Sequence, residues 1–101
     1  MKTPVKNNHI LLTYRFAIGL HKALKKSKVK SFGKLAKIAG IEPAQMQKIS
    51  CGMVDVPYSV SIAIADALGI TPSEFFSYPE KISEKQAKAF FNYLRNPEKI
   101  G

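Results

Sequence analysis

The sequence has a single cysteine, no tryptophan and no long uninterrupted hydrophobic run. Cys51 has no partner for a disulfide within the chain, so a reducing compartment such as the cytoplasm is expected. A helix that spans a membrane needs about 18 consecutive apolar residues, and no stretch of this sequence approaches that length. No membrane segment and no signal peptide are therefore predicted.

Acidic residues are also scarce, with 7 Asp and Glu against 16 Lys and Arg. Their distribution is uneven, because residues 1–48 contain eleven bases and one acid, whereas residues 49–101 contain five bases and six acids. The formal charge of +9 therefore arises entirely from the N-terminal half. Such segregated basic charge is what a polyanion-binding surface requires, although a coat of solvated lysines would have the same composition.

The chain shows no pattern that is typical of catalysis or of metal binding. His9 and His21 lie far apart in the sequence, and neither has a cysteine or a carboxylate at the spacing of metal ligands. A glycine-rich phosphate-binding loop is missing, and the few acids form no paired site. We therefore expect no metal, no cofactor and no enzymatic activity.

Apolar residues recur at helical spacing along the chain, and no segment alternates like a strand, so the sequence predicts an all-α protein of about six helices. Residues 1–8 are polar and contain Pro4, which is typical of a flexible arm. The predicted division is this arm, a helical domain at residues 9–78 and a C-terminal amphipathic helix at residues 79–101.

Capping residues mark where the helices are expected to begin and end. The first helix is predicted to begin at His9, and Ser or Thr N-caps are expected for four of the others, at Ser31, Ser59, Thr71 and Ser83. Gly40 suits the left-handed position that ends the second helix, and Pro43 is expected as the first residue of the third. On the second helix, Ile38 and Ala39 are predicted to face inward with the other apolar residues.

The second and third predicted helices are joined only by Gly40-Ile41-Glu42-Pro43, and two helices with so short a connection cross steeply in a helix-turn-helix. The outward side of the third helix, residues 43–51, carries amides, a lysine and an alanine but no carboxylate. Amides can bond adenine, lysine can reach guanine, and an alanine methyl can contact thymine in the major groove. The predicted base-reading residues are Ala44, Gln45, Gln47 and Lys48.

The segment from Ser31 to Phe76 resembles the phage repressor and Cro type of helix-turn-helix, also called the Xre family. The resemblance rests on residues in the family's order and spacing: Leu35-Ala36, Gly40-Ile41, Ile49, Gly52, Pro57, Ile64-Ala65, the run from Ala67 to Pro72, and Phe75-Phe76. It implies a lambda-repressor-like domain of five helices that binds double-stranded DNA. The implied function is a sequence-specific transcriptional regulator that acts as a repressor.

The resemblance also implies which residues contact phosphates. In such repressors the N-terminus of the second helix contacts the DNA backbone, which corresponds here to Ser31, Phe32 and Lys34. Lys37 on the same helix is expected to contact a phosphate as well. Tyr58 and Ser59, which follow the loop after the third helix, could donate to a phosphate as well.

An alternative function remains open at this point. Pro43 has no N–H to offer a base, and the loop after the third helix contains Asp55 where relatives are often basic. Both departures favour a protein-interaction module, or an antitoxin-like chain with a toxin-like protein as its partner. Such a chain would keep the fold with weak or no DNA reading.

The C-terminal helix carries an apolar stripe at positions i, i+3, i+4 and i+7, formed by Ala87, Phe90, Phe91 and Leu94. The first helix has a second apolar side too, so it is expected to be contacted on more than one face. The stripe either packs onto the first helix of its own domain or forms a homodimer contact. A homodimer is what reading a two-fold operator would require.

Overall fold

The computed structural model describes the backbone of residues 5–95 and the side chains of residues 12–93. Six helices make up this part of the chain and no strand occurs in it, which confirms the all-α prediction. In order they are α1 (Val5–Lys26), α2 (Phe32–Ala39), α3 (Pro43–Ser50), α4 (Tyr58–Leu68), α5 (Pro72–Glu80) and α6 (Glu84–Arg95).

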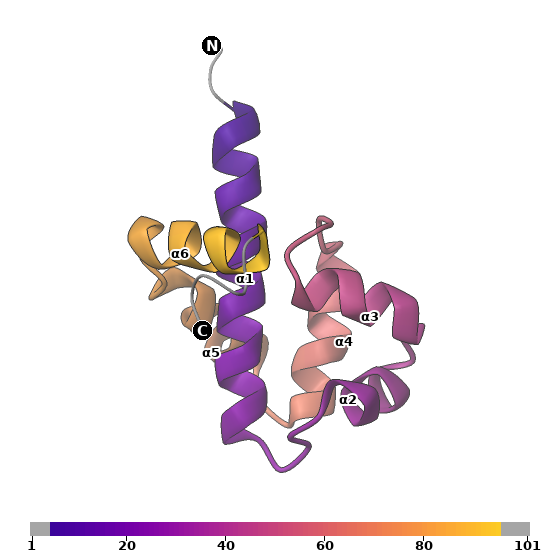
Figure 1. Ribbon diagram of the computed structural model, residues 1–101. Helices are drawn as coiled ribbons and strands as arrows, with labels where there is room; N and C mark the ends of the chain where they lie inside the picture. Colours follow the sequence, from indigo (N-terminus) through magenta and orange to yellow (C-terminus); the bar gives the residue numbers. More distant parts are fainter. Residues whose placement is uncertain (1–4, 96–101) are drawn as a thin grey trace.

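The long helix α1 stands between two groups of shorter helices (Figure 1). On one side lie α2, α3 and α4, and on the other lie α5 and α6, with α6 crossing α1 at a steep angle. Helix α1 contacts α3, α5 and α6, and α4 contacts both α2 and α5. The prediction that α1 is contacted on more than one face is therefore confirmed.

The hydrophobic core fills the space between α1 and helices α2 to α5. Leu20 and Phe75 are fully buried at its centre, and the ring of Phe16 packs edge-on against that of Phe75 with centroids 5.5 Å apart. Each of the other helices in this group contributes residues from one side only, which is the pattern of an amphipathic helix. These residues are Leu35, Ala36, Met46, Ile49, Ile64, Ala65 and Leu68.

Three of the predicted N-caps are confirmed. The Oγ of Ser31 accepts a hydrogen bond from the backbone N–H of Lys34 at 3.1 Å, and Thr71 accepts one from Glu74 at 3.1 Å. At the start of α6 the pair is reciprocal. The N–H of Gln86 donates to Ser83 Oγ at 3.1 Å, and the N–H of Ser83 donates to Gln86 Oε1 at 3.0 Å. Donors that lack an intrahelical partner are thereby satisfied at all three helix starts.

Two predicted helix starts are wrong. Helix α1 begins at Val5 rather than at His9, because residues 5–8 contain no helix breaker and extending a helix is easier than nucleating one. The helical part thus includes half of the expected arm, and residues 1–4 lie outside the described residues. Helix α4 begins at Tyr58, with Pro57 in the N-cap position and no side-chain cap, so Ser59 lies inside the helix.

The inward position predicted for Ile38 is also wrong, because its side chain is 60% exposed. Leu35 and Ala36 are the buried residues of α2. At about 100° per residue, Ile38 points about 110° away from the midpoint of these two, whereas Ala39 lies close to it. Half-buried Ala39 follows the prediction more closely.

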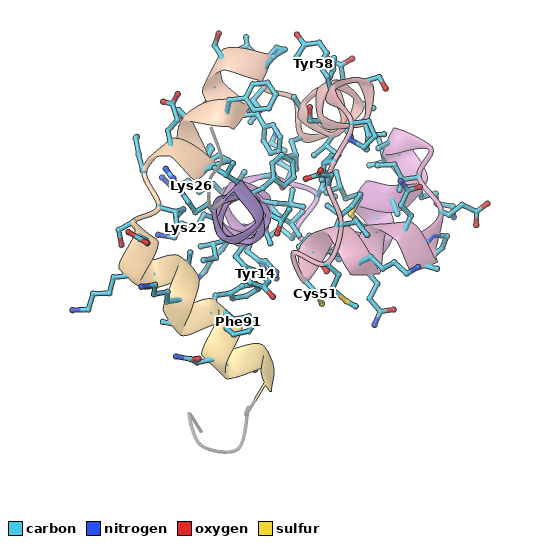
Figure 2. All side chains as sticks on the ribbon, turned by 90° about the horizontal axis from the view of Figure 1, so that it is seen from above. Tyr14, Lys22, Lys26, Cys51, Tyr58 and Phe91 are labelled. Atoms are coloured by element: carbon cyan, nitrogen blue, oxygen red, sulfur yellow. The ribbon has the colours of Figure 1, made fainter. Side chains whose placement is uncertain are left out.

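Helix α6 packs onto α1 within the same chain. Ala87 is fully buried, and the ring of Tyr14 lies 6.0 Å from that of Phe90 and 5.3 Å from that of Phe91. Figure 2 shows Tyr14 and Phe91 facing each other between the two helices. Phe90 and Phe91 are only half-buried there, so a contact between two copies of the chain stays a prediction. The side chain of Leu94 lies outside the described residues.

The approach of α1 to α5 depends on the absence of a side chain at Gly19. A Cβ added to Gly19 would lie 2.6 Å from the backbone nitrogen of Pro79 and 2.8 Å from its Cδ. These atoms belong to backbone and a rigid ring, so they cannot move aside without shifting α5.

We predict that Gly19→Ala destabilises the fold by about 1–3 kcal/mol, because the added methyl overfills the α1–α5 contact. The measurement is urea unfolding followed by circular dichroism. Gly33→Ala is the matched control, since a Cβ there meets nothing within 4 Å and alanine favours a helix. The control should be neutral or more stable by about 0.5 kcal/mol. Equal destabilisation by the two changes would contradict the prediction.

Candidate nucleic-acid interface

The turn between α2 and α3 is built on a left-handed glycine. Gly40 has φ 74° and ψ 34°, and its N–H donates to the carbonyls of Ala36 and Lys37. The N–H of Ile41 reaches the same Ala36 carbonyl at 2.8 Å, which completes a Schellman motif. A residue with a Cβ is disfavoured in this conformation, so Gly40 allows only three residues to separate the end of α2 from the start of α3.

Helix α3 begins without a side-chain cap. Glu42 occupies the N-cap position but makes no cap hydrogen bond, and Pro43 follows as the first helical residue, as predicted. The Glu42 carboxylate is exposed at this helix end. It is the only acid among the first 48 residues, and it lies beside the surface that would approach DNA.

The two sides of α3 differ sharply in burial. Met46 and Ile49 are 2% and 1% exposed and hold the helix against the core. Ala44, Gln47 and Lys48 lie on the opposite side at i, i+3 and i+4, and Gln45 follows one position after Ala44. All four predicted base-reading residues are exposed, namely Ala44, Gln45, Gln47 and Lys48.

The C-terminal end of α3 is attached to α1 through a contact that the sequence did not reveal. His21 Nε2 lies 3.1 Å from the backbone carbonyl oxygen of Ser50, across 29 positions of sequence. The same imidazole packs edge-on against Phe32 of α2, at 4.7 Å between ring centroids, and against Phe90 of α6, at 6.1 Å. His21 therefore joins α1 to both helices of the turn. From the sequence His21 could be assessed only as a possible metal ligand, and a contact across 29 positions leaves no local pattern.

The predicted phosphate contacts fall into two groups. Ser31, Lys34 and Lys37 are all exposed on α2, and the Ser31 hydroxyl is engaged as the N-cap. Tyr58 and Ser59 are exposed at the start of α4. The Tyr58 ring is 73% exposed and stacks on Phe76, with centroids 6.3 Å apart and planes 18° from parallel.

The lysines that are consecutive in sequence do not form one surface. Figure 2 shows Lys22 and Lys26 on the side of α1 that faces away from α3, whereas Cys51, at the end of α3, lies on the other side. Lys34 and Lys37 belong to α2, within the helix pair. The basic charge of the N-terminal half is therefore divided between the helix-turn-helix side and the far side of α1.

The geometry of α2 and α3 defines a helix-turn-helix protein. The second helix of the pair, α3, is short, and its apolar face is buried while its polar face is exposed. A family model of the Cro/C1-type HTH DNA-binding domain matches residues 19–81, more than half of the chain. The protein belongs to this family, which confirms the predicted Xre-type resemblance. The match covers part of α1 and all of α2 to α5, and α6 lies outside it. No curated protein and no solved structure matches the chain.

The described residues form neither a membrane-spanning helix nor a metal-binding cluster. None of the helices there has the length and apolar character needed to cross a membrane. No group of three or more His, Cys, Asp or Glu side chains in the same part of the chain could hold a metal ion.

The uncapped start of α3 leads to a prediction about stability. Glu42→Asp should stabilise the protein by about 1 kcal/mol, because Asp is a favoured N-cap and the charge is unchanged. Ser31→Ala, which removes an existing cap, should destabilise it by about the same amount. Ser59→Ala is the control and should change the unfolding free energy by less than about 0.5 kcal/mol. Thermal unfolding of the three variants measures all three values, and a loss of stability in Glu42→Asp would contradict this description of the α3 start.

Proposed function

We propose that the protein is a cytoplasmic transcriptional regulator of the repressor type that binds double-stranded DNA sequence-specifically through α3. The observation that carries the proposal is the exposed face of α3, where two amides and a lysine project from a helix whose other face is buried. The major groove is about 12 Å wide and admits one α-helix. The family to which the chain belongs supports DNA as the partner.

In this proposal the side chains of α3 read base edges in the groove. Gln45 and Gln47 have the donor and acceptor pair that bonds adenine, Lys48 reaches the acceptors of guanine, and the methyl of Ala44 contacts thymine. Ala44, Gln47 and Lys48 share one side of the helix and would face the same few base pairs. Gln45 is displaced by about 100° around the axis and would contact a base nearer the helix start.

The flanking residues would hold the helix in register through the DNA backbone. Ser31, Lys34 and Lys37 on α2 would contact one strand, and Tyr58 and Ser59 at the start of α4 would contact the other. Contacts to phosphates position a protein on the duplex but carry no sequence information. The Glu42 carboxylate opposes this attraction, so the lysines on α2 have to outweigh it.

Phosphate contact by α2 is tested by binding to random-sequence duplex DNA across a salt series. The double variant Lys34→Ala/Lys37→Ala should weaken binding and lower the slope of log affinity against log salt by about 1.8, because each lost contact removes about 0.9. Lys85→Ala/Lys88→Ala removes the same charge from α6 and is the control, with an expected change in slope below about 0.5. Fluorescence anisotropy with a labelled duplex gives both quantities.

This salt series also separates the proposal from the alternative. No measurable binding of the unaltered chain at low salt would contradict DNA binding and would favour a protein-interaction module, such as an antitoxin-like chain with a toxin-like partner. An equal loss of affinity in both double variants would show that charge alone, rather than α2, determines the binding.

Base reading by α3 predicts a different response. Gln45→Ala/Lys48→Ala should reduce the preference for a selected site over random duplex by about tenfold or more, since each good base contact contributes about 1–3 kcal/mol of discrimination. Selection from a random duplex library identifies the site, and competition binding measures the ratio. Lys34→Ala/Lys37→Ala serves as the comparison, because it should weaken both duplexes about equally. An unchanged ratio in the α3 variant would contradict the assignment.

We also propose that the protein forms a homodimer through α6, because operator reading by this class needs two recognition helices about 34 Å apart. Half-buried Phe90 and Phe91 leave apolar surface uncovered, with Leu94 as the third predicted contact, and Tyr93 beside them is 46% exposed. Tyr93→Lys should weaken the dimer by about tenfold, as expected for an aromatic interface residue. Asn92→Lys adds the same charge one position away on the helix and should have little effect. Sedimentation equilibrium of the full chain tests this, and a monomer at every concentration would contradict it.

A further inference from the structure

A second basic surface surrounds a cavity on the far side of α1. The cavity has a volume of about 340 Å³ and lies between the last turns of α1 and the end of α5 with the two residues that follow it. Four lysines, one tyrosine and one isoleucine line it, and we call it the lysine cavity: Lys22, Lys25, Lys26, Tyr78, Lys81 and Ile82. Figure 2 shows Lys22 and Lys26 directed away from α3, so the lysine cavity is separate from the helix-turn-helix face.

The four lysines are not neutralised within the described part of the chain. The ion pair found there joins Lys88 to Glu84, and none of the four lysines of the cavity takes part in one. Lys25 and Lys26 lie in the last turn of α1, where the helix dipole favours cations. Lys81 is the C-cap of α5, where the dipole of that helix favours a cation in the same way, and Lys22 lies one turn before the end of α1. The C-terminal ends of α1 and α5 thus bring their cations to one cavity.

The floor of the lysine cavity is apolar. Ile82 is 2% exposed, and the half-buried ring of Tyr78 lies beneath Lys26, with Nζ 5.8 Å from the ring centroid. Small-molecule sites typically combine an apolar floor with a few charged groups in a volume of about 300–1,000 Å³. The concave shape, the apolar floor and the four lysines in one lining distinguish this surface from a flat coat of lysines.

A larger cavity of about 660 Å³ adjoins the lysine cavity and shares Lys26 and Tyr78 with it. Its lining combines apolar residues, among them Leu68 and Ile70, with the charged Lys28 and Glu74. A carboxylate disfavours an anion, so a ligand that spans the two cavities would place its negative groups among the lysines. Its uncharged part would lie against the apolar wall.

We propose that the lysine cavity binds the oligophosphate group of a small phosphate ester, such as a nucleoside triphosphate, with the organic part in the adjoining cavity. Ammonium groups form charge-assisted hydrogen bonds with phosphate oxygens, and four of them match a group that carries three to four negative charges. A DNA backbone fits less well, because a duplex is convex and cannot enter a cavity of this size. The inference goes beyond DNA binding and does not depend on it.

Titration of the isotope-labelled full chain with inorganic triphosphate and with ATP, followed by backbone amide NMR, tests the proposal. Both ligands should shift the amides of residues 22–26 and 78–82 before others, and ATP should also shift residues 67–70. Lys22→Ala/Lys81→Ala should weaken triphosphate binding by about tenfold, because two charge-assisted contacts are lost. Lys34→Ala/Lys37→Ala is the control with the same loss of charge and should remain within about twofold.

Three results would overturn the proposal. The first is shifts spread evenly over all exposed lysines, which would indicate general ion attraction. The second is an unchanged affinity in Lys22→Ala/Lys81→Ala, with an unaltered melting curve showing that the variant is folded. The third is a random-sequence duplex that displaces triphosphate and shifts residues 22–26 equally, which would assign the surface to nucleic-acid backbone. Failure of DNA binding at α3 would leave these readouts unaffected.

Discussion

The structure depends on the burial of one face of each short helix against α1 and α4. Helices α2 and α3 have only eight residues each, and a helix of that length is not stable alone in water. They persist because Leu35 and Ile49, at 0% and 1% exposure, are enclosed in a core around Leu20 and Phe75. The exposed face of α3 is therefore rigid for a reason that lies on its opposite side. Precise presentation of polar groups requires this kind of support.

The long helix α1 supplies that support on several sides at once. Its core side packs against Phe75, its other side receives α6 through Tyr14, and His21 contacts the carbonyl at the end of α3. The lysine cavity occupies yet another side, near the C-terminal end of the same helix. One element thus separates a polar helix face suited to a DNA groove from a concave basic surface suited to a compact anion. The two surfaces share no residue.

Charge alone would not have distinguished these surfaces. Eleven bases in the first 48 residues indicate a polyanion partner, but the sequence presents them as one run from Lys22 to Lys37. The run divides because α1 and α2 point in different directions after the turn at residues 27–31. In that turn Lys30 adopts φ 62°. Its backbone N–H donates to Ser27 Oγ at 3.3 Å, and its Nζ donates to the backbone carbonyl of Lys25 at 3.0 Å. The spacing of apolar residues in the sequence does not predict local hydrogen bonds of this kind.

The sequence by itself determined the features that depend on neighbouring residues. Helix caps at Ser31, Thr71 and Ser83, the left-handed Gly40 and the outward face of α3 all follow from interactions within four positions. The spacing of apolar residues determined the all-α class, and the resemblance of the segment from Ser31 to Phe76 to a known motif indicated the family. Tertiary structure decided the rest. The exposure of Ile38, the packing of α6 on α1, the role of His21 and the meeting of Lys81 with the end of α1 depend on which helix lies opposite. Packing between residues that are far apart in sequence determines which helices lie opposite each other, so a local sequence pattern cannot predict it.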